Sequence, residues 1–484
     1  MKKKLLSILL TLCMILAILP ATALAAASYY IDESGDRQIL TDCTPVTSET
    51  TQWEDGGWYI VNNNIVNITG GVTVTGDVKL VLVDGCTLTV TAPTVSTAEG
   101  GLKAGIHVAE GNTLTIYGQD LGTGKLIATG GGGSSGSGGG AGIGGNGTVP
   151  DQPTDGNCGT VIIYGGHIIA TGKSGGAGIG GGGGFSDPSS NTTTNGGNGG
   201  VVKIFGGTVE ATGNDDGAGI GGGRGGGYSS GVYGTGGVGG SGGKVAICGG
   251  TVTANGGFRG AGIGGGAGGT ADRNFNGGTG GDGGEIAISG GAITAESAHG
   301  AGIGGGAGGL GGAANYRKGG NGGKGSVVTI TGGTVTAKSQ NGAGIGGGAG
   351  ANAKESGTAG ITLDSYGGDG GHGDNVTISG GTVAASSYYA PGIGGGYSGK
   401  GYATSSMKYG APGRQVGTVK VTGGSVDAKT STYGTPQIGN SLTRSDYIPT
   451  PGAAVHPKDD NGNTLYLTTV TMTGVGKRRQ RHNT

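Results

Sequence analysis

Eight tyrosines in the glycine-rich part of the chain are the residues whose chemistry best suits ligand binding. A phenol ring offers an apolar face for stacking and a hydroxyl group for hydrogen bonds, which suits contact with a sugar ring. The tyrosines lie in or beside segments whose length differs between repeats, and such surface segments commonly carry binding residues. We therefore predict that carbohydrate, or a host or cell-wall surface, is contacted by Tyr228, Tyr233, Tyr316, Tyr366, Tyr389, Tyr397, Tyr402 and Tyr409. The alternative is that these rings only pin the variable segments to the rest of the fold.

Acidic residues would form a polysaccharide-cleaving site only if two carboxylates met on neighbouring repeats. Paired acids must lie within roughly 5–10 Å of each other to do acid/base work on a glycosidic bond. At the outward strand positions, charged residues such as Glu210 and Asp427 fall toward the ends of the repeat array instead. We predict that the protein is not an enzyme and needs no cofactor, and keep a polysaccharide-cleaving enzyme as the weaker alternative.

The sequence predicts no metal site. Residues 277–282, Gly-Gly-Thr-Gly-Gly-Asp, are similar to the opening of a calcium-binding nonapeptide repeat. The match ends there, because Gly284 stands where an apolar residue is required and no tandem copy follows. The cysteines beyond the first 27 residues are widely spaced, form no CxxC motif and leave their pairing open: Cys43, Cys86, Cys158 and Cys248.

The first 27 residues indicate export. Three lysines at positions 2–4 precede an apolar run from Leu5 to Leu19, and small residues follow it at positions 23–27. This order is typical of a signal peptide, and the run is short for a membrane span. No second apolar run of membrane length occurs, so we predict a secreted or cell-surface protein without a transmembrane segment in the mature chain. The net charge of −1 gives no reason to expect nucleic acid as a partner.

Self-similarity determines the predicted fold. A Gly-Ala-Gly-Ile-Gly-Gly block recurs about every 36 to 48 residues in a chain with 129 glycines. A repeat of this length indicates stacked coils or a similar array, in which each unit buries its apolar face against its neighbours. The central isoleucines of the blocks are Ile143, Ile179, Ile220, Ile263, Ile303, Ile345 and, in a degenerate copy, Ile393.

Each block follows two short stretches in which apolar residues alternate with polar ones, the period of a half-buried strand. A Gly-Gly pair between the stretches predicts a corner, so each repeat forms a three-sided coil. We predict an all-β protein, a parallel and right-handed β-helix or β-solenoid of stacked glycine-rich repeats with long loops on one edge. In one repeat, the side chains expected to face the core are Val245, Ile247, Val252, Ala254, Ala261 and Ile263.

The remaining glycine-rich stretches vary in length and carry Gly-Gly-x-Gly-Gly patterns, for example at 277–281. Such a pattern suits extended polyproline-like backbone and equally suits flexible linkers. If these stretches are surface loops, removing residues 270–281 should leave the stability of the protein nearly unchanged. Shortening a loop alters only its closure entropy, which is a small term. We divide the chain into a signal peptide (1–27), an N-terminal β cap (28–100), the β-solenoid array (101–440) and a C-terminal segment (441–484) that we expect to be the cut end of a longer protein.

Several motifs occur together with the glycine-rich blocks. They are GWYIV at 57–61, GDVKLVLVDGCTL at 76–88 and GNTLTIYGQ at 111–119. In this combination the chain resembles a family of glycine-rich repeat proteins that clostridia and their relatives export to the surface. The resemblance implies a surface location and no particular reaction. We predict an exported structural scaffold without catalytic activity, with adhesin-like binding through the tyrosine-bearing loops as the alternative.

Overall fold

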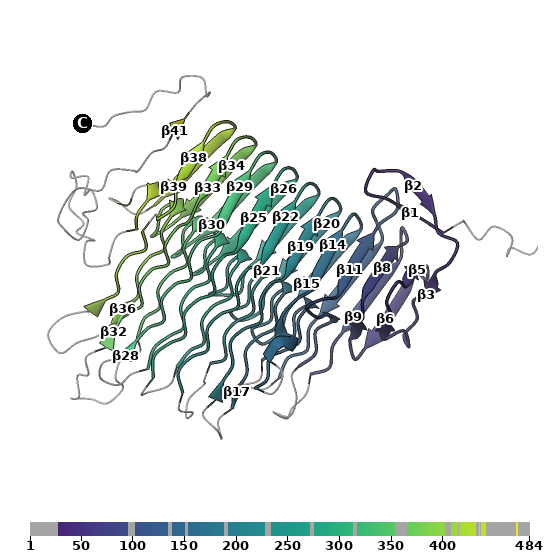
Figure 1. The fold of residues 1–484 in the computed structure, drawn as a ribbon, viewed down its shortest axis with the longest axis horizontal. Coiled ribbons are helices and arrows are strands. Elements are labelled where there is room, and N and C mark those ends of the chain that lie inside the picture. Colours follow the sequence, from purple (N-terminus) through teal and green to yellow (C-terminus); the bar gives the residue numbers. More distant parts are fainter. Residues whose placement is uncertain are drawn as a thin grey trace, which may run out of the picture.

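The computed structural model describes residues 28–94, 102–133, 138–150, 153–187, 192–227, 234–271, 275–312, 317–353, 365–401, 408–414, 416–431, 435, 437–441 and 471–472. Three long sheets of parallel strands run side by side along one axis (Figure 1). One short 3-10 helix, η1 (Pro153–Gly156), is the only helix within these residues, and none of them forms a helix long and apolar enough to cross a membrane.

The first sheet contains β3 (Thr44–Pro45), β5 (Trp58–Val61), β8 (Asp77–Leu82), β11 (Thr113–Tyr117), β14 (Thr160–Ile163), β19 (Val201–Ile204), β22 (Lys244–Ile247), β25 (Glu285–Ile288), β29 (Val327–Ile330), β33 (Val376–Ile378), β38 (Val419–Val421) and β41 (Thr471–Met472). The second sheet contains β6 (Ile65–Thr69), β9 (Thr87–Thr91), β12 (Lys125–Thr129), β15 (His167–Thr171), β20 (Thr208–Thr212), β23 (Thr251–Asn255), β26 (Ala292–Ser297), β30 (Thr334–Ser339), β34 (Thr382–Ser387) and β39 (Ser425–Thr430). The third contains β4 (Gln52–Trp53), β7 (Val72–Val74), β10 (Ile106–Val108), β13 (Ile143–Gly144), β16 (Ile179–Gly180), β21 (Ile220–Gly221), β24 (Ile263–Gly264), β27 (Ile303–Gly304), β31 (Ile345–Gly346), β35 (Ile393–Gly394) and β40 (Ile438–Gly439).

One coil of the chain supplies one strand to each sheet, and equivalent residues of successive coils pair in register. Val245 pairs with Ile286 in the first sheet, and Ile263 pairs with Ile303 in the third. The coil interior is therefore a continuous column of aliphatic side chains, whose burial stabilises the stack at roughly 25 cal/mol per Å². The predicted solenoid is confirmed, and the six predicted core side chains of this repeat are each at most 3% exposed.

The Gly-Gly corner between the first and second strands depends on its second glycine. Gly250 has a φ of +78°, a left-handed conformation that residues with a Cβ rarely adopt. Gly291 and Gly333 occupy the same corner in the next two coils, with φ of +88° and +81°. The predicted corner is thus a turn that repeats with the coil.

The coils from β13 to β35 also send out a glycine-rich excursion each, and these excursions together form what we call the wing. In one coil the outgoing segment is 265–270 and the returning segment is 277–284. Gly266 donates its backbone N–H to the carbonyl of Gly240 at 2.9 Å, and Gly281 donates to Gly266 at 2.8 Å. The same alternation continues through Gly306 and on to Gly413. The wing lies beside the three sheets, and its short strand pairs lie toward its outer end (Figure 1).

A second series of hydrogen bonds runs three residues further out along the wing. Gly269 donates to Gly237 at 2.8 Å, and Gly278 donates to Gly269 at 2.9 Å. A three-residue spacing is typical of polyproline II backbone, which has no hydrogen bonds of its own. Of the two possibilities that the sequence left open, the described parts of the wing adopt the extended one, and the neighbouring segments supply their hydrogen-bond partners.

Within the described residues, four short strand pairs lie outside the three sheets. The hairpin of β1 (Tyr29–Ile31) and β2 (Arg37–Ile39) is antiparallel. In the wing, β17 (Ser186–Asp187) pairs with β18 (Thr192–Thr193), β28 (Arg317–Lys318) with β32 (Ser365–Tyr366), and β36 (Lys400–Gly401) with β37 (Lys408–Tyr409).

The ends of the array show how the expected terminal segments relate to the coils. Within the expected N-terminal cap, the strands from β3 to β9 join the same three sheets as the repeats that follow, and only the hairpin stands outside them. Most of the expected C-terminal segment lies outside the described residues. Its strand β41 pairs in parallel with β38.

Candidate functional site

The structure describes four of the eight predicted tyrosines, and two of these four contact each other. Tyr228, Tyr233, Tyr316 and Tyr402 lie outside the described residues. Tyr366 in β32 and Tyr409 in β37 lie in the wing, and Tyr366 is 36% exposed. The other two, Tyr389 and Tyr397, stack on each other with ring centroids 5.4 Å apart.

Tyr389 and Tyr397 belong to two neighbouring columns of side chains. The first column holds the residue just before the blocks that start at 217, 260, 300, 342 and 390: Asp216, Arg259, His299, Asn341 and Tyr389. The second column lies in the outgoing segments of the wing: Arg224, Ala267, Ala307, Ala349 and Tyr397. Backbone hydrogen bonds join the columns, because Ala349 donates to His299 at 3.0 Å and Tyr397 donates to Asn341 at 3.1 Å.

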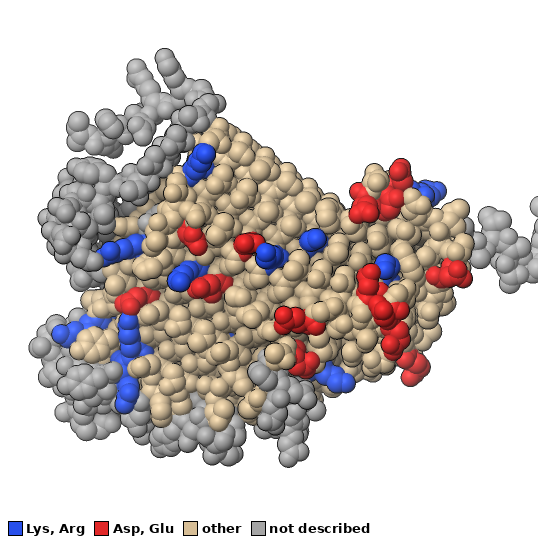
Figure 2. Space-filling view, viewed as in Figure 1, with Lys and Arg blue, Asp and Glu red and all other residues tan. Residues whose placement is uncertain are grey.

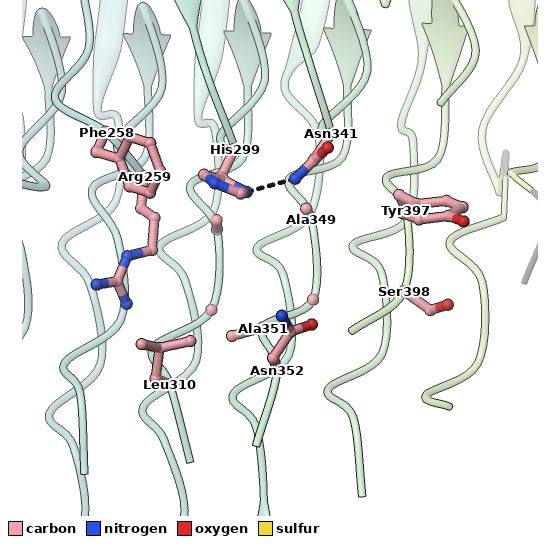
Figure 3. Close-up of a pocket in the computed structure, with 13 residues that line it drawn as sticks. Phe258, Arg259, His299, Leu310, Asn341, Ala349, Ala351, Asn352, Tyr397 and Ser398 are labelled. Atoms are coloured by element: carbon pink, nitrogen blue, oxygen red, sulfur yellow. Dashed lines mark hydrogen bonds between the residues drawn. The ribbon is translucent and has the colours of Figure 1, made fainter. Parts of the chain in front are cut away.

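A cavity of about 190 Å³ opens where the second column contains alanine. Its lining consists of Phe258, Arg259, His299, Ala307, Gly308, Leu310, Asn341, Ala349, Gly350, Ala351, Asn352, Tyr397 and Ser398. In Figure 3, Phe258, His299, Asn341 and Tyr397 follow one another along one side, with Leu310 and Asn352 on the other. The coils just before that of Tyr397 have alanine in the second column, whereas the large side chain of Tyr397 bounds the cavity at its end. We call this cavity the wing groove.

The charged group in the wing groove is already paired. The Arg259 Nε atom lies 3.3 Å from an Asp216 carboxylate oxygen, and the side chain of Asp216 is only 7% exposed. Arg259 Nη1 also donates to Thr270 Oγ1 at 3.2 Å. The groove therefore presents a neutralised guanidinium group beside apolar and amide side chains.

Two aromatic contacts border the groove. The Phe258 ring meets the His299 ring edge-on, with centroids 4.4 Å apart, and Phe258 is 61% exposed. At the far end, Tyr397 is 5% exposed and packs against Tyr389. Tyr397 therefore lines the wing groove, and Tyr389 packs against Tyr397. This packing is also compatible with the alternative interpretation of the sequence, in which the rings hold the glycine-rich segments against the rest of the fold.

Sequence reasoning missed Phe258, Arg259, His299 and Asn341 as site residues. The available signal was the position before each Gly-Ala-Gly-Ile block, where the residue type changes from repeat to repeat while the block itself stays the same. Aligning the repeats on their isoleucines would have shown that these residues stack. It would not have shown that the alanines opposite them leave a cavity.

A ladder of aromatic rings on the first sheet was also not predicted from the sequence. Tyr117 stacks on Tyr164 at 5.2 Å, and Tyr164 stacks on Phe205 at 4.8 Å. Tyr30 of the hairpin packs on Tyr117 and Trp58, and burial raises the pKa of Tyr117 to about 12. The hairpin thus covers the N-terminal part of the ladder, and Phe205 stays 40% exposed at its open end.

Several carboxylates on the outward faces of the sheets have a cationic or imidazole partner on the next rung. Glu210 meets His167 at 2.8 Å, Glu285 meets Lys244 at 3.1 Å, and Glu296 meets Lys338 at 2.8 Å. The face shown in Figure 2 is mostly uncharged, with acidic side chains gathered toward the N-terminal end. In the part of the chain that the structure describes, no group of three or more His, Cys, Asp and Glu side chains is placed to hold a metal ion.

Six segments of the chain match the family model of a β-helix repeat: 161–183, 202–224, 245–267, 286–307, 328–349 and 376–397. Over these segments the chain is similar to β-helix repeat proteins. Each matched segment begins in a strand of the first sheet and ends in the outgoing part of the wing. The returning part of the wing lies outside the matches. Searches of curated proteins and of solved structures gave no significant match.

Proposed function

We propose that this β-helix repeat protein is an exported, non-catalytic rod that acts as an extracellular scaffold at the cell surface or in the medium. The observation that carries the proposal is the hydrogen-bond series of the wing, which links successive coils from Gly197 to Gly413. The aliphatic column of the sheets runs beside it. Each of these coils is thereby bonded to its neighbours on two separate layers, which favours a stiff, elongated body.

The outward carboxylates support the non-catalytic part of the proposal. General acid/base cleavage of a glycan needs two carboxyl groups near one bond. Glu285 and Glu296 instead lie against lysines of adjacent rungs. Because some β-helix proteins do cleave polysaccharides, this part needs a direct test.

Glycan or host-surface binding is the second candidate function. The observation that favours it is the stacked pair Tyr389 and Tyr397 beside the wing groove, since aromatic rings next to amide groups suit sugar recognition. A rod that also binds a surface is an adhesin-like scaffold, so the two candidates are compatible.

The export proposal is tested by expressing the full chain in a bacterial host and separating medium, surface and cytoplasmic fractions. We expect the wild-type chain outside the cytoplasm and a variant lacking residues 5–19 inside it. Equal cytoplasmic retention of both chains would contradict export. The purified protein is then incubated with a panel of plant, fungal and bacterial polysaccharides. Release of new reducing ends would overturn the non-catalytic proposal.

A further inference from the structure

We propose that the wing groove between Phe258 and Tyr397 binds one ring of an uncharged, linear saccharide chain that runs along the long axis of the solenoid. This inference rests on the second candidate function, glycan binding, and assigns it a site and a ligand class. The site is lined by one of the predicted tyrosines, Tyr397, on which Tyr389 stacks, and it adds residues that no tyrosine-loop hypothesis includes.

The buried amide of Asn341 is the first observation. Asn341 is 8% exposed and lines the groove, and its side-chain nitrogen lies 2.5 Å from His299 Nδ1. Its Oδ1 atom is buried and has no hydrogen-bond partner. Exchanging the two amide atoms would leave the nitrogen unpaired instead. In either orientation one polar end is unsatisfied, and a sugar hydroxyl group can both donate to and accept from such an amide.

The groove walls are the second observation. Phe258 and Tyr397 provide aromatic rings, and Ala307, Ala349 and Leu310 provide an apolar surface between the columns. A pyranose ring carries C–H groups on its faces and hydroxyl groups at its edge. Its faces can therefore pack on the aromatic rings and methyl groups of the groove, while its hydroxyl groups bond to the amide side chains.

The charge of the groove decides the ligand class. A uronic acid or a sulfated sugar would require an unpaired cation, but Arg259 already pairs with the buried Asp216. Apart from Arg259 and His299, the lining side chains are neutral. The groove therefore favours an uncharged sugar over an anionic one.

The size and direction of the groove decide the shape of the ligand. A volume of 190 Å³ is small for a complete ligand pocket, which typically measures about 300–1,000 Å³, so it suits one ring of a longer chain. Phe258 and Tyr397 belong to coils that are three apart, and three strand spacings amount to about 14 Å along the axis. A linear chain parallel to the axis would reach both rings.

The experiment is calorimetric titration of the exported chain with cellohexaose, maltohexaose, mannohexaose and chitohexaose, and with hexagalacturonate as the charged comparator. We expect at least one neutral hexasaccharide to bind and hexagalacturonate not to bind. Phe258→Ala and Asn341→Ala should each weaken that binding about tenfold. The matched controls are Phe205→Ala, which removes an exposed ring outside the wing, and Asn321→Ala, which removes a wing amide that accepts from Asp369 N. Both controls should bind like the wild type.

Each other outcome counts against the groove. If a neutral hexasaccharide binds equally well to both groove variants, the assigned site is wrong while glycan binding itself stands. If hexagalacturonate alone binds, the ligand class is wrong. If no saccharide binds, the inference and the glycan-binding function both fail. Because Phe258 is exposed, Phe258→Ala should unfold at the same temperature as the wild type. If Asn341→Ala does not fold, saccharide binding by Phe258→Ala alone tests the assigned site.

Discussion

Gly269 packs so closely against the backbone of Gly226 on the preceding coil that a Cβ atom on Gly269 would overlap the Gly226 carbonyl oxygen. Gly266 and Gly223 are related in the same way. Neither Gly266 nor Gly269 has a left-handed φ. At these positions glycine is required because neighbouring backbones touch, and the conformational freedom of glycine is not the reason.

This contact predicts that Gly269→Ala destabilises the protein. A methyl group must push two wing segments apart, and overpacking of this kind typically costs about 1–3 kcal/mol. Thr279→Ala is the matched control, since Thr279 is an exposed residue of the returning segment in the same coil. Urea unfolding followed by circular dichroism measures both variants. Equal midpoints for Gly269→Ala and the wild type would show that the wing tolerates side chains at this contact.

The buried column of isoleucines predicts a larger effect for Ile263→Asp. Ile263 is fully buried and pairs with Ile220 and Ile303, so a carboxylate there has neither water nor a cation as partner. We expect a loss of more than about 3 kcal/mol in the free energy of unfolding. Thr294→Asp places the same group on an outward strand position and should change stability little. Wild-type thermal unfolding of Ile263→Asp would contradict the stacked core.

Asp155 predicts a pH-dependent contribution to stability. His107 Nε2 lies 3.2 Å from Asp155 Oδ1, Asn146 donates to Oδ2 at 2.8 Å, and these contacts, that of His107 most, hold the pKa of Asp155 below its usual value. With a folded pKa below the unfolded value of about 3.9, the carboxylate stabilises the fold above that pH, and the contribution is lost as pH falls through the folded pKa. Asp155→Asn should therefore lower the melting temperature at pH 7, and the difference from the wild type should shrink as the pH falls.

Thermal unfolding between pH 2 and pH 7 checks this expectation, with Asp42→Asn at an exposed position as the control. A difference between Asp155→Asn and the wild type that stays constant across this range would mean that the contribution of Asp155 does not depend on its charge.

The cysteines predict two classes of thiol reactivity. Cys248 is a free, exposed cysteine, whereas Cys158 is 2% exposed and burial raises its pKa to about 12. The thiolate is the reactive form, so a maleimide at pH 7.5 should label Cys248 in the folded protein and Cys158 only after unfolding. Mass spectrometry of the labelled peptides reads out both sites, and Cys248→Ser should remove the Cys248 label. Rapid labelling of Cys158 in the folded state would indicate that the coil opens there.

Predictions from the sequence were most complete for the coil. Alternation at Val245 and Ile247 and at Val252 and Ala254 has the two-residue period of a strand with one buried face. A single coil has too few such side chains to form a core, so the repeats had to stack. These constraints are local in the sequence, which is why the core residues could be named without a structure.

The backbone conformation of the wing could not be predicted from local sequence patterns. Glycine without a Cβ is compatible with extended, turned and flexible backbone alike, so 277–284 carries no local signal for one of them. Its order depends on hydrogen bonds to Gly266 and Gly269, which lie in another segment of the chain. The expectation that residues 270–281 can be removed at little cost is accordingly revised. Their deletion takes away the partners of Gly306 and Gly309 and should destabilise the neighbouring coil.

The sequence by itself determined the three-sided coil and its buried positions, because strand periodicity acts over a few neighbouring residues. The export signal in the first 27 residues stays a prediction. The tertiary structure alone decided the wing groove. Phe258, Asn341 and Tyr397 come from different coils, and the register of the stack places them along one groove. Whether a side chain fills or leaves space depends on its neighbours in adjacent coils, and that relation exists only after the coils have stacked.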